Sequence, residues 1–204
     1  PQITTKYLQS YQTLAKELNI CIVPGTIVED HSPTNESTST DTQPKDPILY
    51  NTAYFISNDE RPYLTSSGSD PHEVFDTPIG KVGLLICWDL AFPEAFRELI
   101  AAGAEVVVVP TFWTQYDASP ALRAKNPDCE KLFLESVLTT RCFENTCGVV
   151  FANAAGETEG DGFLGLSRVT MPGVGVVGSL GWEEGVCVVD VDMGLVRDAE
   201  ENYR

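Results

Sequence analysis

The stretch from residue 81 to residue 94, Lys-Val-Gly-Leu-Leu-Ile-Cys-Trp-Asp-Leu-Ala-Phe-Pro-Glu, decides the fold. Its part 82–87 is almost continuously apolar, which is typical of a strand buried on both faces of a sheet. A helix is predicted over 92–102, with Pro93 suited to its first turn. Because ligands bind at the carboxyl ends of strands in open α/β sheets, the strand-end thiol of Cys87 is a candidate nucleophile. On spacing alone, an inert buried thiol explains the same pattern.

The rest of the chain alternates helices and strands, as expected for an α/β domain. Apolar residues at helical spacing predict helices over 7–18 and 129–145. Short apolar runs predict strands over 20–24, 48–56, 105–110, 148–152 and 186–191. The polar segment 29–47 predicts a surface loop. With no convincing linker, we expect a single domain over residues 1–204.

Composition and charge exclude several classes of protein. The chain is 43% hydrophobic and carries a formal net charge of −17, so it repels nucleic acids and anionic membranes. No apolar run is long enough for a membrane span, and we expect no signal peptide. The cysteines lack metal-type spacing and several lie in apolar runs. We therefore expect free thiols in the cytoplasm and no metal site.

One glycine pattern is set aside. Residues 173–178, Gly-Val-Gly-Val-Val-Gly, match a dinucleotide-binding fingerprint, which requires a preceding strand and a following helix. Pro172 precedes the pattern, and the next predicted strand begins at Val186, too soon for a crossover helix. We expect a glycine-rich turn or hairpin here and no cofactor.

Several segments, in order along nearly the whole chain, resemble the nitrilase superfamily of carbon–nitrogen hydrolases. Residues 74–94 resemble its nucleophile region, and the Gly-Leu-Ser at 165–167 with Pro172 resembles its late segment. Further matches are 22–25 with 49–53, 104–110 and the Arg-Cys-Phe-Glu-Asn at 141–145. The resemblance implies an α/β fold, a four-layer αββα sandwich, assembled as homodimers or larger homo-oligomers. It also implies hydrolysis of an amide or nitrile by a Glu–Lys–Cys triad, without metal or cofactor.

The resemblance assigns roles to particular residues. Cys87 matches the nucleophile, and Glu60 matches an auxiliary carboxylate that orients the substrate. The backbone N–H of Trp88 would stabilise the developing negative charge. Phe112 and Trp113 would line the substrate pocket, although both also fit ordinary core positions.

The base glutamate and the lysine of the triad have no match in the sequence. The glutamate would precede the first helix, and the lysine would lie between Ile56 and Glu60, where only 57–59 stand. Because the strand over 48–56 leaves no room for a return strand before Glu60, we expect an omitted segment between Asp59 and Glu60. We also expect the domain to be incomplete at both ends.

The expected function is thiol-dependent hydrolysis of the C–N bond of a small amide through a cysteine acyl-enzyme, releasing a carboxylic acid and ammonia or an amine. Residues 87–94 are more similar to the amidase-type branches than to the nitrile-cleaving one. Two alternatives stay open: nitrile hydrolysis by the same thiol, and a non-catalytic protein that binds a ligand or partner through this fold. We expect Cys87 to be the one reactive thiol and Glu60 to lie near its sulfur.

Overall fold

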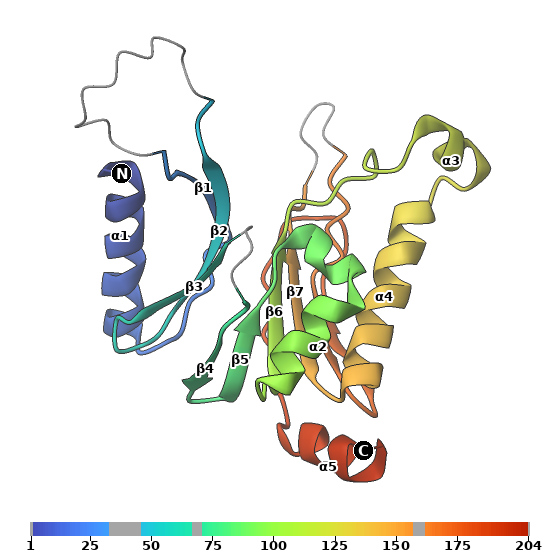
Figure 1. Cartoon of the computed structure of the whole chain (residues 1–204). Coiled ribbons are helices and arrows are strands. Elements are labelled where there is room, and N and C mark those ends of the chain that lie inside the picture. The colour runs from blue at the N-terminus through green and yellow to red at the C-terminus, as the bar shows by residue number, and fades with distance from the viewer. Residues whose placement is uncertain (1, 33–45, 67–70, 157–161, 204) are drawn as a thin grey trace. The chain divides into compact units, whose positions relative to one another are not determined.

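The computed structural model of the protein describes residues 2–32, 46–66, 71–156 and 162–203 (Figure 1). The chain has two compact units, Pro1–Asp70 and Pro71–Arg204, and each is described here by itself. Most of the loop predicted over 29–47 lies outside the described residues. Among the described helices, none combines the length and the apolarity that crossing a bilayer requires.

The first unit is one helix on a three-stranded antiparallel sheet (Figure 1). Its elements are α1 (Gln2–Leu18), β1 (Thr26–Asp30), β2 (Leu49–Ile56) and β3 (Pro62–Ser66). Ala15 of the helix packs with Tyr54 and Ile56 of β2 in a small buried core. The helical spacing of apolar residues in the sequence therefore marks the face that covers the sheet.

The second unit is a six-stranded sheet in the order β4-β5-β6-β7-β8-β9. Its strands are β4 (Val74–Thr77), β5 (Gly80–Leu84), β6 (Val106–Thr111), β7 (Gly148–Asn153), β8 (Arg168–Met171) and β9 (Gly175–Ser179). The three central strands, β5 to β7, are parallel, and the outer pairs are antiparallel.

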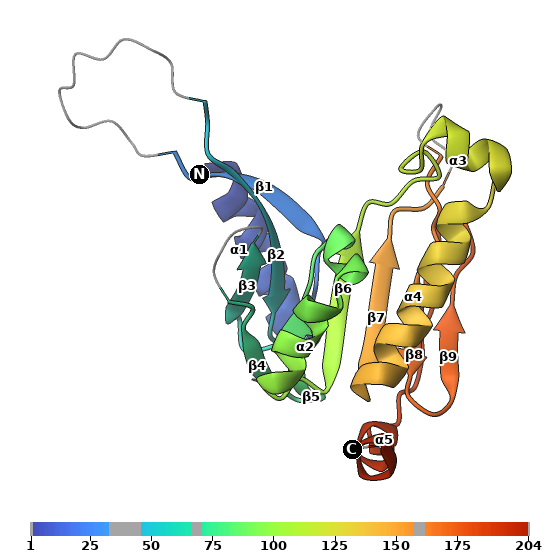
Figure 2. The ribbon, with the colours of Figure 1, turned by 45° about the vertical axis from the view of Figure 1, so that its right-hand side comes forward.

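The helical elements of the second unit are the 3₁₀-helix η1 (Cys87–Ala91), α2 (Pro93–Ala101), α3 (Pro120–Lys125), α4 (Cys129–Asn145) and α5 (Gly194–Tyr203). Helices α2 and α4 lie side by side on one face of the sheet (Figure 2). Val107 and Val109 of β6 are fully buried with Leu99 of α2 and Leu138 of α4. Gly83 permits the close contact of α2 with β5, because a Cβ there would lie 2.6 Å from a methyl of Leu99.

The α/β class is confirmed, and each unit consists of a sheet with helical cover. The predicted helix over 129–145 and the buried strands over 105–110 and 148–152 are confirmed within a residue. The glycine pattern is the turn and second strand of the β8–β9 hairpin, also as expected.

Two strand predictions were wrong. Residues 20–24 form only one isolated bridge, from Ile22 to Ile56. Residues 186–191 belong to no strand of the described sheets, and Val186 and Val188 are 89% and 91% exposed. A run of apolar residues favours an extended chain, but a strand also needs a partner to receive its backbone hydrogen bonds.

The return strand of the β2 hairpin follows Glu60 and does not precede it. The Ser57 N–H donates to Arg61 O at 3.0 Å, and the Glu60 N–H donates to Ser57 O at 3.0 Å, which closes a tight turn. Ile56 then pairs with Pro62 at the start of β3. The argument that no room existed for a return strand was therefore wrong. An omitted segment between Asp59 and Glu60 stays a prediction, without that structural support.

Candidate active site

Cys87 stands where the chain leaves the buried sheet. Leu85 and Ile86 continue the direction of β5 as buried residues, and Cys87 then opens η1. Its φ angle is 48°, in the left-handed region that non-glycine residues rarely adopt. Such a conformation costs on the order of 1–3 kcal/mol and persists only where its surroundings impose it. The sharp change of direction separates the thiol from the strand that carries it.

Asp89 closes the turn around Cys87. Its carboxylate Oδ2 accepts the Ile86 N–H at 2.8 Å, while its own N–H donates to Ile86 O at 3.0 Å. Its carbonyl accepts the Phe92 N–H at 3.0 Å, where α2 begins. Leu90 is fully buried in the core with residues of α2 and α4, and it anchors the turn there. The backbone on both sides of Cys87 is thus fixed by hydrogen bonds and packing.

The surroundings of the Cys87 sulfur favour the neutral thiol. Burial is the main cause that raises the pKa of Cys87 above its usual value, and the negative charges of Asp117 and Asp89 raise this pKa further. The nearby backbone amides of Phe112 and Trp88 lower this pKa and so oppose the rise. The role expected for the Trp88 N–H stays a prediction, and Phe112 adds a second backbone amide near the sulfur that the sequence analysis did not assign.

Asn153 binds the residues on both sides of Phe112. Its Oδ1 accepts the Trp113 N–H at 2.7 Å and the Thr111 hydroxyl at 2.8 Å, and its Nδ2 donates to Trp113 O at 3.2 Å. Sequence analysis missed Asn153, although it directly follows the apolar run 148–152. That position at the carboxyl end of a buried strand is the signal that could have identified it.

The three aromatic residues expected at the site differ in exposure. Trp88 is 55% exposed and Phe112 is 65% exposed, whereas Trp113 is 1% exposed. The Trp113 ring lies 5.1 Å from that of Trp88, and its Nε1–H donates to Glu130 Oε2 at 2.7 Å. Trp113 is thus packed in the core against Trp88, and its expected place in the substrate pocket stays a prediction.

Glu60 lies in the turn between β2 and β3, in the first unit. Its carboxylate pairs with the ammonium of Lys16 at 2.9 Å, and its carbonyl accepts the Gln12 amide at 2.8 Å. Cys87 belongs to the second unit. The expected proximity of Glu60 to the Cys87 sulfur therefore stays a prediction.

The other thiols fall into different classes. Cys142 and Cys147 are buried, and burial raises the pKa of Cys142 to about 12. Cys187 is exposed. The expectation that Cys87 alone reacts therefore does not extend to Cys187, which any soluble alkylating reagent can reach.

Comparison with known proteins gives matches over most of the chain. A family model described as carbon–nitrogen hydrolase matches residues 2–201. A probable nitrilase of Schizosaccharomyces pombe is 31% identical over 172 residues, which are 76% of this chain and 58% of that protein. A deaminated glutathione amidase of Rattus norvegicus is 32% identical over 127 residues, which are 62% of this chain and 35% of that protein. The aligned region is thus only part of each of these relatives.

The fold also matches a solved structure. A carbon–nitrogen hydrolase from Helicobacter pylori G27 is similar with a TM-score of 0.78 at 16% sequence identity. The match covers 99% of this chain and 72% of that chain. At this identity the likeness bears on the fold alone.

The strained backbone at Cys87 predicts that glycine gives a more stable protein there than alanine, the reverse of their order in an ordinary helix. Cys87→Gly is expected to have a higher free energy of unfolding than Cys87→Ala, by about 1 kcal/mol, because glycine adopts a left-handed backbone without steric cost. Urea denaturation followed by circular dichroism measures the difference. As a control, Ala95→Gly in α2 is expected to lose about 1 kcal/mol, the ordinary helix preference. Equal stability of the two Cys87 variants would refute the strain.

The raised pKa of Cys87 predicts slow alkylation at neutral pH. In the 204-residue chain, iodoacetamide at pH 7 is expected to label Cys87 more slowly than the exposed Cys187 of the same molecule, because the thiolate is the nucleophile. The labelling rate at Cys87 then rises steadily as pH increases into the alkaline range. Peptide mass spectrometry measures both sites, and an unlabelled Cys142 shows that the chain stays folded. Faster labelling of Cys87 than of Cys187 at pH 7 contradicts the site described above.

Proposed function

The chain belongs to the carbon–nitrogen hydrolase family, and from that premise we propose that it hydrolyses the C–N bond of a small amide with Cys87 as the nucleophile. The observation that carries the proposal is the placement of this thiol. It leaves a buried strand through a left-handed turn and lies beside the backbone N–H groups of Trp88 and Phe112. A thiol that stands on a strained backbone, beside groups that favour its anion, is typical of functional sites.

The proposed reaction has two steps. The Cys87 thiolate attacks the amide carbonyl carbon, and the resulting oxyanion is stabilised by backbone N–H donors near the sulfur. The C–N bond breaks as the nitrogen takes up a proton, leaving an acyl group on the sulfur and releasing ammonia or an amine. Water then attacks this thioester, releases the carboxylic acid and restores the thiol.

The first step needs a base for the thiol proton. Burial and the carboxylates of Asp117 and Asp89 keep the pKa of Cys87 raised, so the thiolate is scarce at neutral pH. We propose that a glutamate base and a lysine, as the nitrilase resemblance implies, supply the proton acceptor and the positive charge. In that arrangement Glu60 orients the substrate, and the exposed rings of Trp88 and Phe112 contact it. No metal or cofactor is needed for these steps.

An amide is preferred to a nitrile as the substrate. The Cys-Trp-Asp-Leu-Ala-Phe-Pro-Glu segment at 87–94 resembles the amidase-type branches, and the rat relative named above is an amidase. The net charge of −17 favours approach of neutral or cationic amides over anionic ones. We further propose that the enzyme acts in the cytoplasm as a homodimer or larger homo-oligomer.

A second candidate function is binding without catalysis. It is favoured by one observation, the carboxylates of Asp117 and Asp89 beside a buried thiol whose pKa is raised. Without a base and a cation, that thiol is a poor nucleophile. In this case the exposed Trp88 and Phe112 form part of a ligand-binding surface.

Substitution of the thiol separates the two candidates. In the full polypeptide, Cys87→Ala is expected to lower the release of ammonia from small amides by at least about 1,000-fold, because the covalent route is lost. The exposed and remote Cys187→Ala serves as the control and is expected to retain turnover. A panel of matched nitriles, assayed in parallel, distinguishes amide from nitrile hydrolysis.

Two results would overturn the amidase proposal. Turnover that survives in Cys87→Ala would place the chemistry elsewhere. Absence of turnover in the unsubstituted protein, together with saturable quenching of tryptophan fluorescence by amides, would establish the non-catalytic candidate.

A further inference from the structure

We infer that Arg141 is a positioning residue that holds the Cys87 turn in its left-handed conformation, an inference whose catalytic consequence rests on the proposed function. Arg141 lies in α4, far from Cys87 in sequence, and its role does not depend on contact with the sulfur. It acts on the other end of the turn that begins at Cys87.

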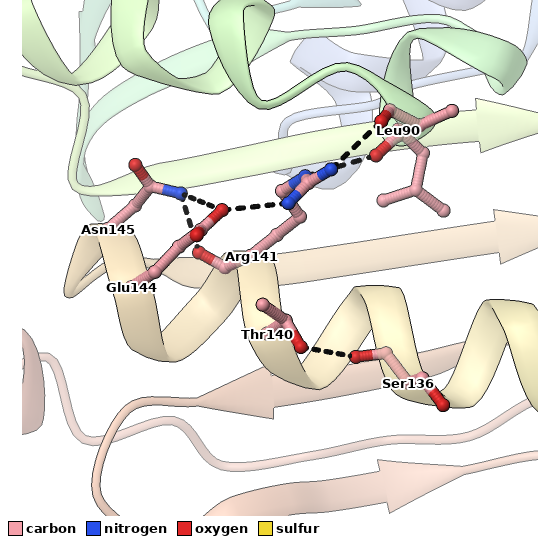
Figure 3. Close-up of polar contacts among 7 residues, drawn as sticks. Leu90, Ser136, Thr140, Arg141, Glu144 and Asn145 are labelled. Carbon is pink, nitrogen blue, oxygen red and sulfur yellow. Dashed lines mark hydrogen bonds and ion pairs between the residues drawn. The ribbon is translucent and has the colours of Figure 1, made fainter.

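The guanidinium binds the carbonyl end of η1 (Figure 3). Arg141 Nε donates to Leu90 O at 3.2 Å, and Nη2 donates to Ala91 O at 2.9 Å. Leu90 and Ala91 are the last two residues of η1. Carbonyl groups at a helix end lack partners within the helix, so a buried end needs donors from elsewhere. The planar, forked guanidinium can reach both carbonyls at once, which an ammonium group cannot do.

The guanidinium itself is firmly held. Its side chain is 9% exposed, and Nη1 pairs with Glu144 Oε1 at 2.8 Å (Figure 3). Asn145 Nδ2 donates to Arg141 O at 2.9 Å and lies 3.5 Å from the same Glu144 oxygen. The Phe96 ring lies 5.9 Å from the guanidinium carbon. Glu144 balances the buried positive charge, so the pair is fixed between α4 and the turn.

The turn is therefore held at both ends. Asp89 accepts the Ile86 N–H on the strand side of Cys87, and Arg141 binds the carbonyls on the helix side. The left-handed φ of Cys87 is costly, and it persists because these contacts leave the backbone no easier path. Without Arg141, the turn can relax and move the sulfur away from the backbone amides of Trp88 and Phe112 that lower its pKa. A displacement of about 1 Å at a catalytic group is enough to lower the rate about 100-fold.

Arg168 provides a matched control. Its side chain is 10% exposed and pairs with Glu135 of the same helix α4 at 3.2 Å. Its Nε donates to a backbone carbonyl, Leu166 O, at 3.1 Å. Arg168 thus repeats the burial, the ion pair and the carbonyl contact of Arg141, but at β8. Its loss costs stability for the same reasons without releasing η1.

A double-mutant cycle tests the inference without any activity. The gain in urea midpoint of Cys87→Gly over Cys87→Ala is measured in the unsubstituted chain and in the Arg141→Met, Arg141→Lys and Arg168→Met backgrounds. We expect Arg141→Met to abolish the gain, since a relaxed turn no longer strains Cys87. Arg141→Lys, which keeps the charge but not the fork, is expected to retain part of the gain. Arg168→Met lowers both midpoints and leaves the gain unchanged.

Either outcome of the cycle decides the inference. A gain that is undiminished in the Arg141→Met background would overturn it, because Arg141 would then be only a structural residue. If Arg141→Met does not fold, Arg141→Lys decides in the same way. Failure of the proposed function is separate, because it shows as absent turnover in the unsubstituted protein and leaves the cycle intact.

In the full enzyme the same variants have a kinetic signature. Arg141→Met is expected to lower kcat about 100-fold with little change in KM, because the thiol is misplaced while the substrate surface is kept. Arg141→Lys is expected to restore part of kcat, and Arg168→Met to leave both constants near their original values. Equal kinetic effects of Arg141→Met and Arg168→Met would contradict a positioning role.

Discussion

The left-handed backbone at Cys87 is the constraint on which the geometry of the site depends. Its φ of 48° turns the chain out of the buried sheet, and the thiol lies beyond the carboxyl end of β5. The conformation is costly, so it has to be imposed by the parts around it. Asp89 and the core residue Leu90 supply those contacts within the turn, and Arg141 supplies them from α4. The sheet and the helix thus act together on one residue.

Geometry and charge have opposite effects on this thiol. The backbone N–H groups of Trp88 and Phe112 favour an anion at the sulfur, whereas burial, Asp117 and Asp89 disfavour it. The net result is a raised pKa, so within the second unit the thiol is held in place but is weakly activated. For this thiol to act as the proposed nucleophile, a base and a cation near it are needed. The proposed amidase and the binding alternative differ in whether these groups are supplied.

The sequence was most informative about the strands and helices that have a clear hydrophobic periodicity of their own. The strand at 105–110 and the helix at 129–145 were identifiable because burial on two faces and helical spacing leave clear periodicities. Of the strand predicted over 82–87, only residues 82–84 belong to β5, because the chain turns into η1 at Cys87. The short strands β1, β3, β4 and β8 were missed, since their stability comes from neighbouring strands and not from their own residues. For the same reason, the sequence could name Cys87 but not the contacts of Asp89 and Arg141 that hold its turn. The burial of Trp113 and the roles of Asn153 and Phe112 depend on strand ends that only the folded sheet brings together.

The central claim, that Cys87 is the nucleophile of a C–N hydrolase, is tested most directly by trapping the covalent intermediate. The full polypeptide is mixed with a slowly hydrolysed small amide, quenched in acid at short times, and analysed by peptide mass spectrometry. The account predicts an added mass equal to the acyl group on the peptide that contains Cys87, decaying as the carboxylic acid forms. Formation of the acid with the acyl group on another residue, or with none on Cys87 at any time during turnover, would contradict it.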